Sequence, residues 1–391
     1  MATDRNQAPK VAVLVDTSTG WGRRMISGVT GYAHKRGPWH VWVEPRGRSE
    51  HLTLPPDWNG DGIIARISTA RMADALDQLG VPVVNVSGIE IKGRAYPTVT
   101  TDSLATAKLT AEHFLDRGFK HYAYLGPMKH SYVRGHYESL GKVLQDAGVD
   151  NPFAVFDYKY ESVSNRGWHD QYKKLSDWLI KLPKPLAIIA WATTGAPHVL
   201  DICRDAGIAT PDDVAVLASD EDALLCEATS PPLSAVLIAS RQIGYRAAER
   251  LDAMMRGGVD SGGTEHFSPV EIITRGSTET FAIEDKELLS AVLYMRQNAF
   301  GPLTVQEIAD AVPMTRRSLE RKFQSNYGRT PLTELHRLRL ARAKQLLAQT
   351  DQPIAQVAEA CGFGTPEYLA TRFRVEVGTT PLRFRSISRG R

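Results

Sequence analysis

Short apolar runs alternate with helix-spaced segments over residues 8 to about 280. The first run, "KVAVLVD", is followed by "GRRMISGVTGYAHKRG", in which Met25, Val29 and Tyr32 share one helical face. Further apolar runs are "GDGIIARI", "VPVVNVSG", "KHYAYLG", "LAIIAWA" and "VAVLASD", with helix-spaced segments between them. Strand followed by helix, repeated many times, predicts α/β architecture with parallel sheets covered on both faces.

The pattern changes in the last third of the chain, where one phrase occurs twice. "LTVQEIADAVPM" and, about fifty residues later, "PIAQVAEACGF" each place apolar residues at helical spacing before a turn and a second short helical run. We therefore predict an all-α region with two helix-turn-helix units, at about 304–327 and 354–377. Leu319 and Phe323 in the first unit, and Leu369 and Phe373 in the second, are assigned to its core.

Both units end in Gly-x-Thr-Pro-Leu, at 328–332 and 378–382. The glycine can leave a helix with positive φ, and the proline can begin the next helix. Between the units, "LTELHRLRLARAKQLLAQT" predicts a long amphipathic helix that fixes their spacing. On DNA, the second helix of each unit would then enter successive major grooves, roughly 34 Å apart.

Length and charge support this division. A chain of 391 residues predicts two or three packed units. The net charge of +3 is unevenly distributed, because residues 284–391 carry +6 and the rest of the chain carries −3. Most of the positive charge in 284–391 is arginine, which suits phosphate and guanine, although charge alone is equally consistent with a solvated helical surface.

Cysteine usage and hydropathy indicate a reducing, aqueous compartment. Cys203, Cys226 and Cys361 lie far apart, without a CxxC pair or histidines at metal-ligand spacing. We therefore expect no disulfide framework, no metal and no cofactor. The polar N-terminus precedes only five apolar residues, and no run approaches the roughly 18 residues of a membrane span. We expect a cytoplasmic protein without a membrane partner.

Ligands of parallel α/β sheets bind beyond the carboxyl ends of the strands, so the polar and aromatic residues there are candidates for a site. A carboxylate, an arginine and aromatic faces suit a sugar. Each residue alone is also consistent with a helix N-cap or a turn, as for Asp220 before "EDALLCE". The candidate ligand-binding residues are Asp16, Trp21, Arg134, Trp191, Thr193 and Asp220.

Three segments, "VTTDSLATAKLTAEHFLDRGFKHYAYLG", "AIIAWATTGAPHVLDICRDAGIATPDDVAVLASDED" and "EIITRGST", resemble the effector-binding core of the LacI/GalR repressors. The resemblance implies a periplasmic-binding-protein-like sensor of two α/β lobes around a cleft, over residues 8–280. It also implies that Asp220 and Arg134 bind the effector. Thr193 stands where that family commonly has an aspartate. That family carries its DNA-binding headpiece before the first strand, whereas here we expect DNA binding from the C-terminal region.

The paired helix-turn-helix units, ending in "GTTPLRFR", resemble the DNA-binding domain of the AraC/XylS regulators, here over 284–391. The resemblance implies base-facing positions in the second helix of each unit, with Tyr368 and Arg372 closer to the DNA backbone. Either base or phosphate contact suits any one arginine. The candidate DNA-binding residues are Arg316, Arg317, Glu320, Arg321, Pro366, Glu367, Tyr368, Ala370, Thr371 and Arg372.

Sensor and reader together imply a transcription activator that binds an operator, contacts RNA polymerase and responds to a sugar. The stretches "ISGVTGYAH", "DWNGDGIIA", "RQIGYRAAERL" and "MRQNA", together with the domain order, resemble pentose-responsive members of the AraC/XylS regulators. This resemblance implies D-xylose as the first expectation, with another pentose or a hexose as the alternative. The resemblance also implies a homodimer formed through helices near 24–32 and 72–79. A solute-binding receptor is the rival reading from another class. We do not expect an enzyme, because the sequence contains no GxSxG, Walker loop or GxGxxG motif after the first strand.

Overall fold

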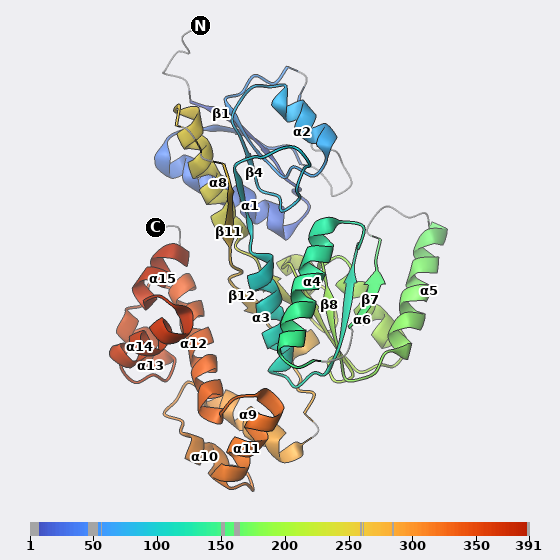
Figure 1. Cartoon of the computed structure of the whole chain (residues 1–391), viewed down its shortest axis with the longest axis vertical. Helices are drawn as coiled ribbons and strands as arrows, with labels where there is room; N and C mark the ends of the chain where they lie inside the picture. Colours follow the sequence, from blue (N-terminus) through green and yellow to red (C-terminus); the bar gives the residue numbers. More distant parts are fainter. Residues whose placement is uncertain are drawn as a thin grey trace. The chain divides into compact units, whose positions relative to one another are not determined.

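The computed structural model describes residues 8–45, 54–55, 57–149, 153–159, 165–258, 260, 262–283 and 285–388 (Figure 1). The chain forms two compact units, and each is described by itself. The large unit contains residues up to 111 together with 121–279. The C-terminal unit contains residues 280 onward together with 112–120.

The first lobe of the large unit is built on a six-stranded, wholly parallel sheet with the order β11-β5-β4-β3-β1-β2. Its strands are β1 (Lys10–Leu14), β2 (His40–Trp42), β3 (Gly62–Ala65), β4 (Val83–Asn85), β5 (Thr98–Thr101) and β11 (Thr264–Phe267). Its helices are α1 (Gly20–Arg36), α2 (Ala70–Asp77) and α8 (Ser240–Met255). The apolar runs of the sequence form β1 and β3, which are almost fully buried.

The second lobe has a six-stranded sheet with the order β12-β10-β9-β8-β6-β7, in which only β12 is antiparallel to its neighbour. Its strands are β6 (His121–Gly126), β7 (Ala154–Asp157), β8 (Leu186–Ala190), β9 (Val214–Ala218), β10 (Ser234–Leu237) and β12 (Glu271–Ile273). Its helices are α4 (Ser131–Asp146), α5 (Asn165–Lys181), α6 (Ala196–Asp205), α7 (Ala223–Glu227) and the 3-10 turn η1 (Gly276–Thr278). The predicted two-lobed α/β architecture is therefore confirmed.

Helices α1 and α8 pack with their backbones in close contact, which requires glycine on both. A Cβ on Gly28 would lie 2.0 Å from the carbonyl oxygen of Arg241, and a Cβ on Gly244 would lie 2.2 Å from that of Met25. The apolar face predicted for α1 lies in this contact, because Met25, Val29 and Tyr32 are buried. The helical period in the sequence thus corresponds to the packed face.

The C-terminal unit is helical and contains the two predicted helix-turn-helix units. Gly328 and Gly378 end α11 and α14 with φ of 63° and 74°, as their repeated motif predicts. Among the described residues, no helix is long and apolar enough to cross a membrane. The helices are α9 (Lys286–Asn298), α10 (Val305–Asp310), α11 (Arg316–Tyr327), α12 (Pro331–Gln349), α13 (Ile354–Ala360), α14 (Pro366–Val377) and α15 (Pro381–Ser388).

Helix α12 joins the cores of the two helix-turn-helix units. Leu319 and Phe323 of the first unit pack with Leu335 of α12, whereas Leu369 and Phe373 of the second pack with the later part of the helix. All four predicted core residues are fully buried, as expected. Over 19 residues, α12 is about 28 Å long at 1.5 Å per residue. The two units are thus held by one continuous helix.

A buried charge cluster joins residues 112–120 to the first turns of α12. Arg329 and Arg337 both contact the carboxylate of Asp116, the latter at 2.5 Å, and both also contact Glu334, at 2.7 and 2.8 Å. The side chains of the two acids are only 3% and 5% exposed. Neither charge is left unpaired, which is the condition for burying it.

The acids of this cluster have opposite pKa shifts. Burial raises the pKa of the Asp116 carboxyl, and the negative charge of nearby Glu334 raises it further. Burial would also raise the pKa of Glu334, but the hydrogen bond from Arg337 and the positive charges of Arg337 and Arg329 outweigh burial and lower it to about 2. Glu334 therefore holds the negative charge most firmly.

The three cysteines are free and buried. Burial raises the pKa of each thiol, Cys203, Cys226 and Cys361, to about 11. Very little thiolate therefore forms at neutral pH, and these side chains act as small apolar groups in the packed interior.

Candidate functional site

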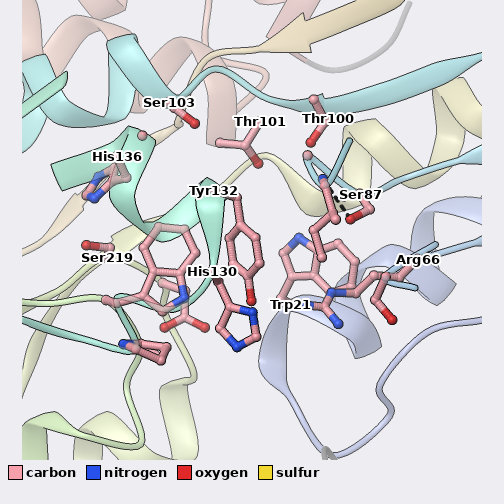
Figure 2. A pocket seen from close by; sticks show the side chains of 18 of the residues that line it. Trp21, Arg66, Ser87, Thr100, Thr101, Ser103, His130, Tyr132, His136 and Ser219 are labelled. Carbon is pink, nitrogen blue, oxygen red and sulfur yellow. Dashed lines mark hydrogen bonds between the residues drawn. The ribbon is translucent and has the colours of Figure 1, made fainter. Parts of the chain in front are cut away.

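The large unit has a cavity of about 1130 Å³ between its two lobes, shown in Figure 2. Residues that follow the strands of both sheets line it, as expected for parallel α/β folds. Of the six predicted ligand-binding residues, Asp16, Trp21, Trp191 and Asp220 lie in this lining and Arg134 and Thr193 do not.

The first lobe contributes a carboxylate paired with a cation. Asp16 follows β1 directly, and Nη1 of Arg66, which follows β3, lies 3.6 Å from its carboxylate. Trp21 lies in the first turn of α1, whose start is fixed because the Thr19 hydroxyl accepts a hydrogen bond from the Gly22 amide at 3.0 Å. This side therefore offers an acceptor, a donor and an aromatic face.

On the second lobe, Thr193 holds Asp220 in place. The Thr193 amide donates to Oδ1 of Asp220 at 2.8 Å, and the Thr193 hydroxyl donates to its backbone carbonyl at 2.6 Å. Asp220 lines the cavity and Thr193 lies behind it. This geometry gives Thr193 a positioning contact with Asp220, and its predicted direct contact with the ligand stays a prediction.

Arg134 has a similar indirect relation to the cavity. Its Nη1 donates to the backbone carbonyls of Met128 at 2.7 Å and Lys129 at 3.1 Å. The loop that it holds carries Lys129 and His130, and both line the cavity. The predicted contact of Arg134 with the effector stays a prediction, and the structure assigns its guanidinium to the loop.

An aromatic group lies at the second-lobe side of the cavity. The Trp191 ring lies 5.5 Å from Tyr132 and 5.3 Å from His136, centroid to centroid. Nδ1 of His136 is 3.0 Å from the hydroxyl of Tyr124. Burial lowers the pKa of His136 to about 4, so the imidazole is neutral at neutral pH.

This histidine makes the large unit sensitive to acid. The unfolded chain binds a proton at its ordinary pKa near 6.5 and the folded chain only near 4, so stability is full above 6.5 and is lost as pH falls toward 4. We expect about 2 kcal/mol of this loss between pH 7 and pH 5. All seven tryptophans lie between residues 21 and 191, so urea unfolding monitored by tryptophan fluorescence reports on the large unit. His136→Gln should flatten this dependence, and an unchanged slope would contradict the assignment.

Two acids next to Asp220 connect the lobes, and the sequence did not identify them as such. Asp222 accepts hydrogen bonds from the Gly20 amide at 2.7 Å and from Arg23 at 2.9 Å. Glu221 accepts from Arg24 at 2.8 Å and from Arg275 at 3.1 Å. Since Gly20, Arg23 and Arg24 belong to α1, this segment after β9 connects both walls of the cavity.

Most other lining residues were also absent from the prediction. They follow strands by the same rule that selected Asp16 and Asp220, so inspecting every strand end would have found many of them. Among those with polar side chains that the prediction did not include are Arg66, Ser87, Thr100, Thr101, Ser103, Lys129, Asp157 and Lys159.

A second candidate site is the exposed face of α11 in the C-terminal unit. Arg316, Arg317 and Arg321 are all exposed there, and Arg316 pairs with Glu320 at 3.0 Å. Among the described residues, Arg317 and Arg321 have no ionic partner. Arg316 and Arg317 lie in the first turn of α11, where cations are unfavourable to the helix dipole, so a polyanion is their natural complement.

The corresponding helix of the second unit, α14, is less basic. Glu367 and Thr371 are exposed on it and Pro366 is its first residue. The Tyr368 hydroxyl lies 3.0 Å from Nε2 of His336, and Arg372 pairs with Glu376 at 2.7 Å. These contacts orient both side chains within the unit, and their contacts with DNA stay predictions.

Three models of known protein families match successive segments of the chain. A XylR N-terminal domain model matches residues 10–108, a periplasmic binding protein-like domain model matches 111–278, and a helix-turn-helix domain model matches 308–387.

Known proteins resemble the chain over its full length. It is 27% identical over 383 residues to the xylose operon regulatory protein of Escherichia coli K12, covering 97% of each chain. The corresponding protein of Haemophilus influenzae is also 27% identical, over 96% of this chain and 98% of its own. Among solved structures, the xylose-binding transcription activator XylR matches with a TM-score of 0.63 and 25% identity, over 98% of this chain and 99% of that one.

Proposed function

The chain is a DNA-binding transcription regulator of the AraC family with a periplasmic-binding-protein-like sugar sensor, and it is homologous over its full length to xylose operon regulatory proteins. From this we propose that it activates genes of pentose catabolism in response to D-xylose. It is a regulator and not an enzyme. The single observation that carries the proposal is the joint presence of the interlobe cavity and the paired helix-turn-helix units on one chain that aligns end to end with those regulators.

The chemistry of the cavity supports a sugar. Asp16 and Asp220 face it from opposite lobes, and each carboxylate can accept two hydroxyl hydrogen bonds. Trp21 and Trp191 supply apolar faces for the C–H surface of a sugar ring. Another pentose or a hexose is the second candidate, because identity at the 27% level leaves the lining residues free to differ.

The proposed mechanism is closure of the two lobes around the sugar. A ligand shifts such an equilibrium only by its greater affinity for one state, so it has to touch both walls in the closed form. Residues 112–120 and the C-terminal helices belong to one compact unit, and residues 112–115 are the last turn of α3 (Ser103–Leu115). Movement of α3 during closure would therefore be transmitted to the C-terminal unit, which contains the helix-turn-helix pair.

Self-association and a contact with RNA polymerase belong to the same proposal. We propose a homodimer through the helices near 24–32 and 72–79. In α1 the residues Met25, Val29 and Tyr32 are buried against α8, so the opposite face of that helix is the one open to a partner. Sedimentation of the full chain with and without D-xylose tests the dimer.

The test of function is a thermal-shift screen of the full chain, followed by tryptophan fluorescence, with D-xylose, L-arabinose, D-ribose, D-xylulose, D-glucose and D-galactose. A ligand that binds only the folded state stabilises it by about 2.7 kcal/mol at a hundred times its Kd. We expect D-xylose to raise Tm most.

Asp220→Asn keeps an acceptor for the Thr193 amide but removes the charge. We expect this variant to bind D-xylose about 10- to 100-fold more weakly, because a hydrogen bond to a charged group contributes about 1.5–3 kcal/mol. The matched control is Asp201→Asn, an exposed acid on α6 that pairs with Arg204. Stabilisation by a different sugar would replace D-xylose as the effector, and no stabilisation by any sugar would refute the proposal.

A further inference from the structure

Two polar atoms of the cavity lining are buried without a partner among the described residues. They are Nε2 of His136, on α4, and Oγ of Ser219, directly after β9. The two residues are 1% and 3% exposed. Buried polar atoms are nearly always hydrogen-bonded, so two such atoms in residues that line one cavity require an explanation.

Both residues lie on the second-lobe side of the cavity. In Figure 2, His136 and Ser219 occupy the left of the view, and Trp21, Arg66 and Ser87 of the first lobe occupy the right. Trp191 also lines the cavity, with its ring 5.3 Å from that of His136. The side of the cavity that holds the two orphaned atoms therefore also has an aromatic wall.

We propose that His136 and Ser219 form a hydroxyl-reading subsite, which selects the effector by requiring a ligand hydroxyl at each of the two atoms. The inference rests on the proposed function and deepens it, since it assigns the residues that distinguish a sugar from its deoxygenated analogues.

The chemistry of both atoms fits a hydroxyl better than any other neutral group. Nδ1 of His136 is engaged with the Tyr124 hydroxyl, and Nε2 is a donor in one tautomer and an acceptor in the other. A serine hydroxyl also both donates and accepts. A ligand hydroxyl can complete either arrangement, whereas a carbonyl can only accept and a carboxylate would bring an uncompensated charge against a buried neutral ring.

The subsite differs in kind from the carboxylates. Asp16 and Asp220 bind any hydroxyl within reach and contribute affinity. The two orphaned atoms contribute selectivity against deoxy analogues, because an analogue without the matching hydroxyl leaves a buried polar group unsatisfied. A site built to pair with a hydroxyl discriminates strongly against a ligand that lacks it.

The test measures binding of mono-deoxy analogues. The six-sugar screen identifies the sugar that most stabilises the wild-type chain, and the affinities of that sugar and of each of its mono-deoxy analogues are then measured by tryptophan fluorescence. We expect two analogues to bind roughly 5- to 150-fold more weakly than the parent sugar. In His136→Phe the parent should weaken and the penalty for one deoxy position should disappear. In Ser219→Ala the penalty for the other position should disappear.

The matched control is His34→Gln, an exposed histidine on α1, which should leave every ratio unchanged. Unchanged deoxy ratios in both variants would overturn the subsite and leave the sugar-responsive function standing. If His136→Phe does not fold, the test rests on Ser219→Ala and on the wild-type affinities for the parent sugar and its mono-deoxy analogues. A wild type that binds every mono-deoxy analogue within twofold of the parent sugar also overturns the subsite. Absence of binding by all six sugars would refute both the function and the subsite.

Discussion

A chain in which Arg317 and Arg321 are both alanine is expected to bind its operator roughly 10²- to 10⁴-fold more weakly than the wild type. Both side chains are exposed on α11 without an ionic partner among the described residues. If each reads a base, it contributes about 1–3 kcal/mol of discrimination, so the two together contribute about 2–6 kcal/mol. The measurement is fluorescence anisotropy with DNA that the wild type has selected from a random pool.

The salt dependence of the same titrations separates base reading from phosphate contact. Loss of two phosphate contacts should reduce the slope of log K against log salt by about 2 and weaken binding to all sequences equally. Loss of two base contacts should relax sequence preference at particular positions and leave the slope unchanged. The matched control is Arg204→Ala, an exposed arginine of α6, which should change neither quantity. Unaltered affinity in the double variant would remove α11 as the reading helix.

The elements that the sequence predicted are those with strong local signals. β1, β3, β6, β8 and β9 are apolar runs, and the two helix-turn-helix units carry caps, turns and matching core positions. Three of the missed strands, β5, β11 and β12, lack these signals, whereas β10, which reads "SAVL", is a buried apolar run that the prediction overlooked. β5 reads "TVTT" and is nevertheless largely buried, because tertiary contacts such as the one between Thr98 and Asn85 satisfy its polar groups. β11 and β12 are short edge strands with half-exposed residues.

The candidate site was predictable as far as the strand-end rule reaches. Asp16 and Asp220 follow strands and line the cavity, whereas Arg134, selected as an arginine suited to a sugar, lies on α4 with its guanidinium bound to backbone carbonyls. Contacts between distant segments had no local signal. Gly20 and Asp222 lie 202 positions apart and Arg329 and Asp116 lie 213 apart, so nothing near either residue in the sequence indicates its partner.

The second large effect is expected at Asp116. In Asp116→Ala, Arg329 and Arg337 each lose one of their two carboxylate partners and keep only Glu334. Removing one partner from a buried ion pair costs about 3–5 kcal/mol when the remaining charge is left without compensation. Because both arginines keep Glu334, we expect a smaller loss of about 1.5–3 kcal/mol, the contribution of a hydrogen bond to a charged group. We expect this loss in the C-terminal unit, and hydrogen exchange of the α12 peptides should be correspondingly faster. The tryptophan signal, which comes only from the large unit, should change little.

The controls for Asp116 separate charge from packing. Asp201→Ala removes an exposed acid paired with Arg204 and should change stability by less than about 1 kcal/mol. Asp116→Asn keeps the side chain's size and one acceptor, so its loss should fall between those of the wild type and the alanine variant. Unchanged exchange in α12 would show that the cluster adds no net stability.

Asp116 also lies at a position where loss of a contact should alter the response to sugar. Ser103 and Thr106, in the first turn of α3, line the cavity, and Asp116 comes one residue after that helix ends. One helix therefore connects a ligand-lining segment to a residue that is ion-paired within the C-terminal unit. Asp116→Asn should bind sugar with wild-type affinity by tryptophan fluorescence, while the gain in operator affinity on adding sugar becomes smaller. An equal gain in both proteins would mean that the signal reaches the reader by another route.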